Sequence, residues 1–217
     1  MEKTEKDSGL PDIFLQVVLV LVMVFSYLFM HDVPRKVWGK LRLRNRADIQ
    51  AKRYFVEGAQ LLGRARSSKS RVLAKEAQAQ AQRAISLDPR DAAPYLLKAL
   101  ALDFQGLRSA ALDSLDEALS PLAAKSLTDL ERGDALLKRA ELRLGTSQRG
   151  RVDSALADLV ESVKLSPNNA KAFCLLGECY ERKKMNDDAV EAYQQALRLE
   201  PQLRVAQQAL HKLNGEH

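Results

Sequence analysis

The amino-acid sequence predicts an all-α protein: an α-solenoid of about four helix hairpins and a C-terminal capping helix, preceded by a single transmembrane helix. Three observations lead to this prediction. Past residue 40, the 217-residue chain is rich in Ala, Leu, Gln, Arg and Glu and poor in β-branched residues, as helical proteins are. Small and apolar residues recur at helical spacing, and the pattern recurs at a longer fixed interval. Near the amino terminus, eighteen consecutive residues carry no charge.

This uncharged run covers residues 13–30 and follows a short tail, residues 1–12. As a helix it would be about 27 Å long, close to the hydrocarbon thickness of a bilayer. A cleaved signal peptide would start with basic residues, whereas acidic residues prevail in this tail. A buried core helix would need a polar side, for which only Gln16, Ser26 and Tyr27 are available. The sequence therefore predicts a retained membrane anchor.

The flanks of the run predict its orientation. Six basic residues follow it within residues 35–46: Arg35, Lys36, Lys40, Arg42, Arg44 and Arg46. Because basic flanks stay in the cytosol, we expect a single-pass protein with a non-cytosolic amino terminus and a cytosolic domain of residues 51–217. The strong hydrophobicity of the run favours the endoplasmic reticulum, with the mitochondrial or plastid outer membrane as alternatives.

The formal net charge of +6 is concentrated in residues 31–71, where twelve Lys or Arg face three acidic residues. The chain beyond is not basic and has few aromatics, so nucleic-acid binding is not expected. Within the predicted juxtamembrane segment, residues 31–50, the six basic side chains named above could contact anionic lipid head groups. Alternatively, these charges only set the topology.

Residues 170–203 carry the clearest helix-hairpin pattern. Eight positions at helical spacing hold large apolar residues, small residues and a final proline: Phe173, Leu176, Gly177, Tyr180, Ala189, Tyr193, Ala196 and Pro201. This segment resembles the tetratricopeptide repeat, a 34-residue helix hairpin that matches all eight positions. The resemblance implies a stack of such hairpins, because none can bury its apolar stripe alone.

The pattern recurs upstream, so the predicted repeats span about residues 51–91, 92–125, 133–169 and 170–203. About seven extra residues near residues 67–70 and about three near residues 145–150 predict surface insertions. In the third repeat, Arg139 and Arg143 stand where Leu and Tyr are expected. Residues 203–213 predict a capping helix whose inward side chains are Val205, Ala206, Ala209, Leu210 and Leu213.

Little in the sequence indicates catalysis. The three histidines are scattered, and no nucleophile elbow, phosphate-binding glycine loop or metal-ligand cluster is found, so we expect no enzyme, no cofactor and no metal. Cys174 and Cys179 lie five residues apart and point in different directions on one helix. They are interpreted as reduced packing residues.

The resemblance implies that the first helix of each hairpin lines a concave groove that holds a protein segment. Carried over by position, the groove residues are Phe55, Val56, Ala59, Leu96, Leu97, Leu100, Phe104, Leu137, Lys171, Cys174, Leu175 and Glu178. Because most are apolar, an apolar or amphipathic helix is the expected ligand. Alternatively, the juxtamembrane segment or the irregular residues 119–134 fill the groove.

Repeats of this family that dock the acidic tails of heat-shock chaperones use a clamp of Lys, Asn, Asn, Lys and Arg. The corresponding positions here hold Phe55, Ala59 and Leu97, then Lys171, which matches, and Leu175, which does not. The resemblance therefore argues against docking of chaperone tails through this clamp.

Together these features predict a membrane-anchored, cytosol-facing adaptor that holds a protein partner in its groove. Two alternatives stay open: a receptor for precursor proteins at an organelle's outer membrane, and a structural subunit of a membrane complex.

Overall fold

The structure, a computed structural model, describes residues 9–30, 33–145 and 151–215, and describes side chains for residues 14–27, 46–145 and 151–213. Within these ranges all regular structure is helical, as predicted. The elements are α1 (Gly9–Met30), α2 (Val33–Ser68), α3 (Arg71–Leu87), α4 (Ala93–Phe104), α5 (Arg108–Ala118), the 3-10 helix η1 (Ala124–Ser126), α6 (Asp129–Leu144), α7 (Arg151–Leu165), α8 (Ala170–Arg182), α9 (Asn186–Leu199) and α10 (Arg204–Gly215). The chain forms two units, Met1–Ile49 and Gln50–His217.

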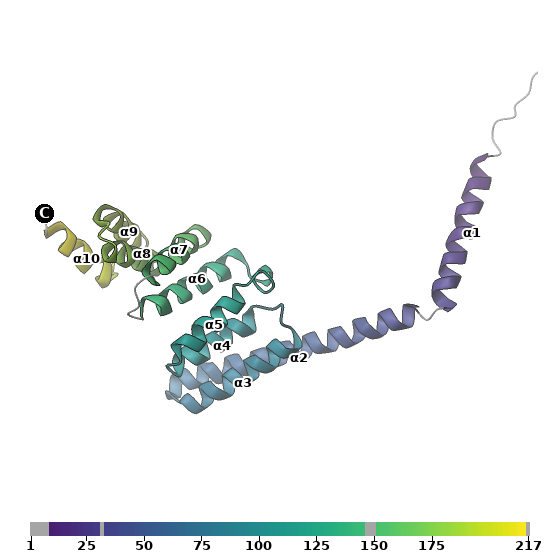
Figure 1. Cartoon of the computed structure of the whole chain (residues 1–217), viewed down its shortest axis with the longest axis horizontal. Coiled ribbons are helices and arrows are strands. Elements are labelled where there is room, and N and C mark those ends of the chain that lie inside the picture. Colours follow the sequence, from purple (N-terminus) through teal and green to yellow (C-terminus); the bar gives the residue numbers. More distant parts are fainter. Residues whose placement is uncertain (1–8, 31–32, 146–150, 216–217) are drawn as a thin grey trace, which may run out of the picture. The chain divides into compact units, whose positions relative to one another are not determined.

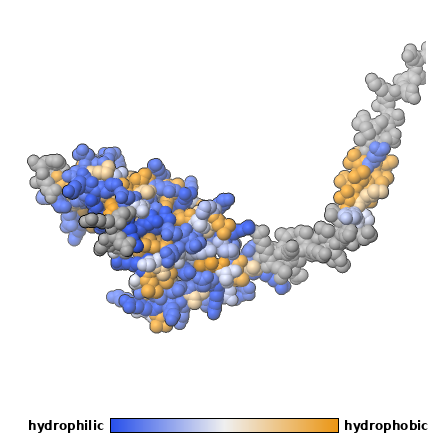
Figure 2. Space-filling view, in the orientation of Figure 1, coloured by the Kyte–Doolittle hydropathy of each residue, from blue (hydrophilic) through white to orange (hydrophobic). Residues whose placement is uncertain are grey.

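In the first unit, α1 exposes large apolar side chains along residues 14–27, which form the orange surface on this helix in Figure 2. None of the helices in the described ranges is both long enough and apolar enough to cross a bilayer. The predictions of a transmembrane helix at residues 13–30 and of a single-pass membrane location are therefore wrong.

The basic residues predicted to meet lipid head groups lie on α2. The side chains of Arg35, Lys36, Lys40, Arg42 and Arg44 fall outside the described residues, and Arg46 is exposed. Their contact with lipid stays a prediction that the structure does not test.

In the second unit the helices follow one another as a solenoid of hairpins (Figure 1). From α3 onward each helix packs on the next along the chain, up to α10 on α9. Small residues sit where helices cross: Ala99, Ala111 and Ala118 in the second hairpin are at most 1% exposed, and Ala189 and Ala196 in the fourth are fully buried. A small side chain lets two helix backbones approach closely, which explains why equivalent positions of these hairpins hold small residues.

The fourth hairpin shows the closest of these approaches. A Cβ atom on Gly177 would lie 2.8 Å from the ring of Tyr193, so no larger residue fits without movement. Tyr193 is 2% exposed, and its hydroxyl donates a hydrogen bond of 2.6 Å to Oε2 of Glu181. Burial and this bond to a carboxylate raise the pKa of Tyr193.

The extra residues of the first hairpin, predicted as a surface insertion, are exposed at residues 66–69 and lie mostly within helices. Helix α2 continues to Ser68 and α3 begins at Arg71, with the Ser70 side chain accepting a hydrogen bond from the amide of Leu73. Only Lys69 turns the chain, in the left-handed region at φ 51°. The added residues therefore lengthen the two helices. The predicted insertion of the third hairpin falls mostly on residues 146–150, outside the described residues.

Helix α10 covers the end of the stack, with Ala206 and Leu213 buried and Ala209 and Leu210 half-buried against α9. Val205 is an exception to the predicted inward face, because it is 62% exposed. It lies at the first turn of the helix, before the packed face begins.

Candidate peptide-binding surface

The predicted groove residues lie on α2, α4, α6 and α8, the first helices of the four hairpins, and they divide by burial. Leu97, Leu137 and Cys174 are between 5% and 8% exposed and belong to the hydrophobic core. Val56, Ala59 and Lys171 are exposed. Half-buried side chains make up the rest: Phe55, Leu96, Leu100, Phe104, Leu175 and Glu178. A ligand could reach the last two groups without disturbing the core.

The amino-terminal half of this surface is apolar. Phe55, Leu100 and Phe104 pack, half-buried, against a core cluster that includes Leu62 and Leu97. Val56, one residue along from Phe55, leaves 51% of its surface exposed. We call Phe55, Val56, Leu100 and Phe104 the apolar patch. These side chains pack on the core and still leave apolar surface accessible, as side chains at contact surfaces do.

The carboxyl-terminal half carries charges instead. Lys138 on α6 forms ion pairs with Asp103 on α4, at 2.8 Å, and with Glu141, at 3.2 Å. Glu141 in turn pairs with Lys171 on α8. We call this chain of alternating charges the charge ladder; it links three successive first helices. Partial burial by itself would lower the pKa of Lys138, but the bonds and charges of Asp103 and Glu141 together raise it.

A second ionic network lies on another face of α6. Both oxygens of Asp158 on α7 accept hydrogen bonds from Arg139, at 2.9 and 2.6 Å, and one also accepts from Arg143 at 2.6 Å. Arg139 reaches Asp116 on α5 as well, at 2.8 Å. Asp158 is 5% exposed, so three helices share a buried ionic centre. Sequence reasoning found the two unusual arginines but missed their partner.

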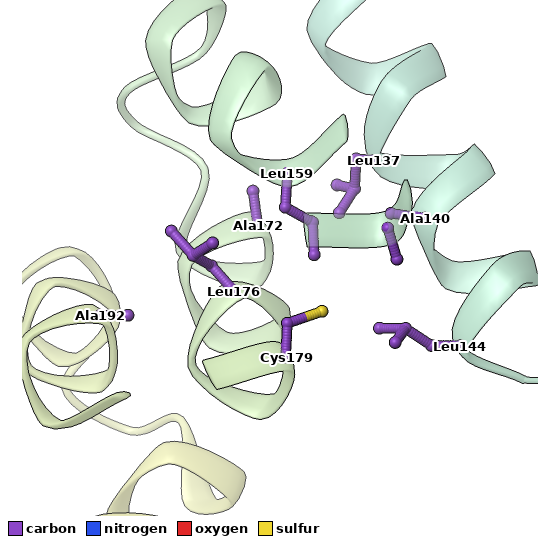
Figure 3. Close-up of a cluster of buried hydrophobic side chains, with 9 residues drawn as sticks. Leu137, Ala140, Leu144, Leu159, Ala172, Leu176, Cys179 and Ala192 are labelled. Carbon is purple, nitrogen blue, oxygen red and sulfur yellow. The ribbon is translucent and has the colours of Figure 1, made fainter. Parts of the chain in front are cut away.

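Apolar side chains from four helices meet beside these networks. Leu137, Ala140 and Leu144 of α6 approach Cys179 and neighbouring residues of α8 in Figure 3. Burial, with a smaller effect of Glu178, raises the pKa of the Cys179 thiol to about 12. Cys174 and Cys179 are both free and buried, which agrees with the interpretation as packing residues. Among the described residues, no three potential metal ligands come together.

Residues 119–134, predicted to be irregular, share no cluster of described apolar side chains with the apolar patch. Ala123 is buried against Ala92 and Ala118, and the amide of Ala92 donates a hydrogen bond of 2.9 Å to Oγ of Ser126. Residues 123–127 of this stretch therefore pack near the amino-terminal end of α4, whereas Leu100 and Phe104 lie toward its carboxyl-terminal end. Residues 129–134 are not irregular, because α6 begins at Asp129.

Comparison with known proteins agrees with this geometry. Residues 170–203 match the tetratricopeptide repeat family. MamA from Desulfovibrio magneticus RS-1, residues 41 to its end, is similar in structure, with 23% identity, a TM-score of 0.63, and coverage of 77% of this chain and 85% of that one. Pseudomonas aeruginosa PilF has 19% identity, a TM-score of 0.61, and coverage of 80% and 70%. No curated protein sequence matches.

A third similar structure is the first repeat domain of Spaghetti (RPAP3) bound to the HSP90 peptide SRMEEVD, with 19% identity and a TM-score of 0.50. The match covers 59% of this chain and 97% of that one. At these identities the likeness shows the fold alone. Residues 170–203 thus match one tetratricopeptide repeat, and the described residues have the fold of a tetratricopeptide-repeat α-solenoid.

Proposed function

We propose that this protein is a non-enzymatic adaptor that binds an apolar or amphipathic segment of a protein partner on its apolar patch. The observation that supports the proposal is the position of Phe55, Val56, Leu100 and Phe104 on first helices, where their apolar side chains remain partly or largely accessible. An amphipathic helix could bury its apolar face on these side chains, which is a common mode of peptide recognition.

The charge ladder limits which partners fit. Lys138 and Lys171, the cations of this surface, already pair with Asp103 and Glu141. An acidic tail would have to displace those carboxylates before gaining an ion pair of its own. We therefore do not propose docking of acidic chaperone tails, in line with the absence of four of the five clamp residues.

The test compares partners of the wild type with those of a Val56→Glu variant by proximity labelling in cells. Val56 is 51% exposed, so a carboxylate there should spoil an apolar contact while leaving the fold intact, as circular dichroism would verify. Val205→Glu is the matched control, because Val205 is 62% exposed on α10, away from the patch.

We expect Val56→Glu to lose partners that the wild type and Val205→Glu both retain. Equal partner lists for all three proteins would count against the apolar patch as a binding surface. Leu97→Glu is unsuitable for this test because Leu97 lies in the core.

A further inference from the structure

A hollow of about 280 Å³ lies among α3, α4 and α5, apart from the apolar patch. Tyr95, Lys98 and Leu102 of α4 form one wall, and Asp113 and Glu117 of α5 form the other. With 3.6 residues per turn, Tyr95, Lys98 and Leu102 lie on the opposite side of α4 from Leu100 and Phe104. A ligand in the hollow would therefore not compete with one on the patch.

Beside the hollow, a charged residue replaces an apolar one of the repeat pattern. In the fourth hairpin this position holds Leu176, which is 6% exposed and packs in the core. In the second hairpin it holds Lys98, whose ammonium group donates a hydrogen bond of 2.8 Å to Oε1 of Gln82. The ammonium group of Lys98 is thus held by Gln82 of α3.

The hollow is lined by two carboxylates and by one ammonium group, that of Lys98, which donates to Gln82. The carboxylates outnumber the cation, and the apolar floor suits a ligand with a cationic head and an apolar stem. Asp113 and Glu117 lie four residues apart on one face of α5, and both are exposed. Among the described residues, their side-chain carboxylates accept no hydrogen bond and form no ion pair. Leu102 gives an apolar floor, and Tyr95 presents an aromatic ring. The pKa of Tyr95 is raised by burial and by the negative charges of Glu117 and Asp88, which indicates a negative potential here.

We infer that this hollow receives an arginine side chain from a protein partner. A guanidinium group is flat and can lie on the ring of Tyr95 while its N–H groups donate to the carboxylates of Asp113 and Glu117. Its three methylene groups can rest on Leu102. The same carboxylates would bind a lysine less well, because an ammonium group is more strongly hydrated and lacks the planar fork.

The test titrates the isotope-labelled full chain with an acetylated and amidated peptide, Ala-Ala-Arg-Ala-Ala, observed by NMR. The control peptide carries citrulline, which is neutral and nearly the same shape, in place of arginine. We expect shifts of the backbone amides around Tyr95 and Ser114 and an affinity for the arginine peptide at least about tenfold above the citrulline peptide.

Two variants locate the effect. Asp113→Asn with Glu117→Gln should weaken the arginine peptide at least about fivefold, and Lys98→Leu should abolish binding by filling the hollow. Asp187→Asn with Asp188→Asn removes the same charge from an exposed part of α9 and should leave binding unchanged. Equal binding of the citrulline peptide, shifts away from α4 and α5, or equal weakening by the α9 variant would each overturn the inference.

Discussion

The fourth hairpin is closed by an aromatic ring lying on a glycine, whereas the third is closed by two arginines that share one buried carboxylate. Tyr193 and Gly177 meet through apolar contact alone at the helix crossing. Arg139 and Arg143 meet Asp158 through three hydrogen bonds of 2.6 to 2.9 Å. The same architecture therefore tolerates two packing chemistries, provided that each fills the space between its helices.

The two chemistries differ in how they fail. An apolar contact contributes gradually less to stability as shape complementarity decreases. A buried charge that loses its partner instead destabilises the fold by its full free energy of desolvation. The stability of the third hairpin should therefore fall most when one charged side chain is removed. The stability of the fourth should fall most when a methyl group is added at the helix crossing. Four predictions test this difference.

The largest effect is expected for Asp158→Ala. The side chains of Arg139 and Arg143 are only 17% and 19% exposed, so they would keep their charges with little water and without their main partner. We expect the free energy of unfolding to fall by about 3 kcal/mol, measured by urea denaturation. Glu161→Ala on the same helix removes an exposed partner of Arg132 and should cost no more than about 1 kcal/mol. Similar losses of unfolding free energy for both variants would show that the buried ionic centre contributes no more to stability than an exposed ion pair.

In the fourth hairpin, Gly177→Ala should cost about 1 to 3 kcal/mol, because the new methyl group would press on the buried ring of Tyr193. Gly63→Ala is the matched control in α2, where an added Cβ atom meets nothing within 4 Å. That change should stabilise the helix by about 0.5 to 1 kcal/mol, since alanine has the higher helix propensity. If both changes raised the thermal midpoint, close contact at Gly177 would not limit this hairpin.

The comparison can also be tested by replacing the ionic residues of the third hairpin with the corresponding residues of the fourth. In the fourth hairpin, Leu176, Tyr180 and Ala192 occupy the positions of Arg139, Arg143 and Asp158. The triple variant Arg139→Leu, Arg143→Tyr and Asp158→Ala should therefore unfold within about 1 kcal/mol of the wild type, because an apolar set of suitable volume can replace a buried ionic one. A triple variant as unstable as Asp158→Ala alone would mean that the third hairpin cannot accept the packing of the fourth.

The sequence pattern predicted the all-α solenoid because size and spacing along one helix decide which residues face a neighbour. It revealed Arg139 and Arg143 as departures but not Asp158, because a pairing across two helices depends on how they cross. One signal was present: Asp158 stands 34 residues before Ala192, a charged residue at a buried small position. Spacing also did not reveal that three of the predicted groove residues, Leu97, Leu137 and Cys174, are buried.

Two other expectations depended on features that spacing does not encode. The extra residues before Ser70 were compatible with a loop or with longer helices, and the helical propensity of the flanking residues decided for longer helices. The charge ladder from Asp103 to Lys171 joins three helices that lie far apart in sequence. Its four residues were visible as charges, but their alternation appears only once the helices are side by side.

The smallest predicted effect concerns the start of α6, where the third and fourth hairpins also differ. Thr128 and Glu131 form a reciprocal cap in which the Glu131 carboxylate accepts from the Thr128 amide at 2.9 Å, whereas α8 has only the side chain of Asn169. The hydrogen bonds from the backbone and the hydroxyl of Thr128 hold the pKa of Glu131 below its usual value. Glu131→Gln should cost less than about 0.5 kcal/mol at neutral pH, because the site is exposed and screened.

The pH dependence of that small cost identifies its origin. A carboxylate whose pKa is lowered in the folded state contributes stability above its unfolded pKa, near 4.5, and loses that contribution as pH falls through the folded value. The difference in unfolding free energy between wild type and Glu131→Gln should therefore be constant above about pH 5 and shrink below pH 4.5. Asn169→Ala in α8 removes a cap without a titrating group, so its cost should not change over this range. A cost of Glu131→Gln that stayed constant down to pH 3 would assign the cap to hydrogen-bond geometry rather than to charge.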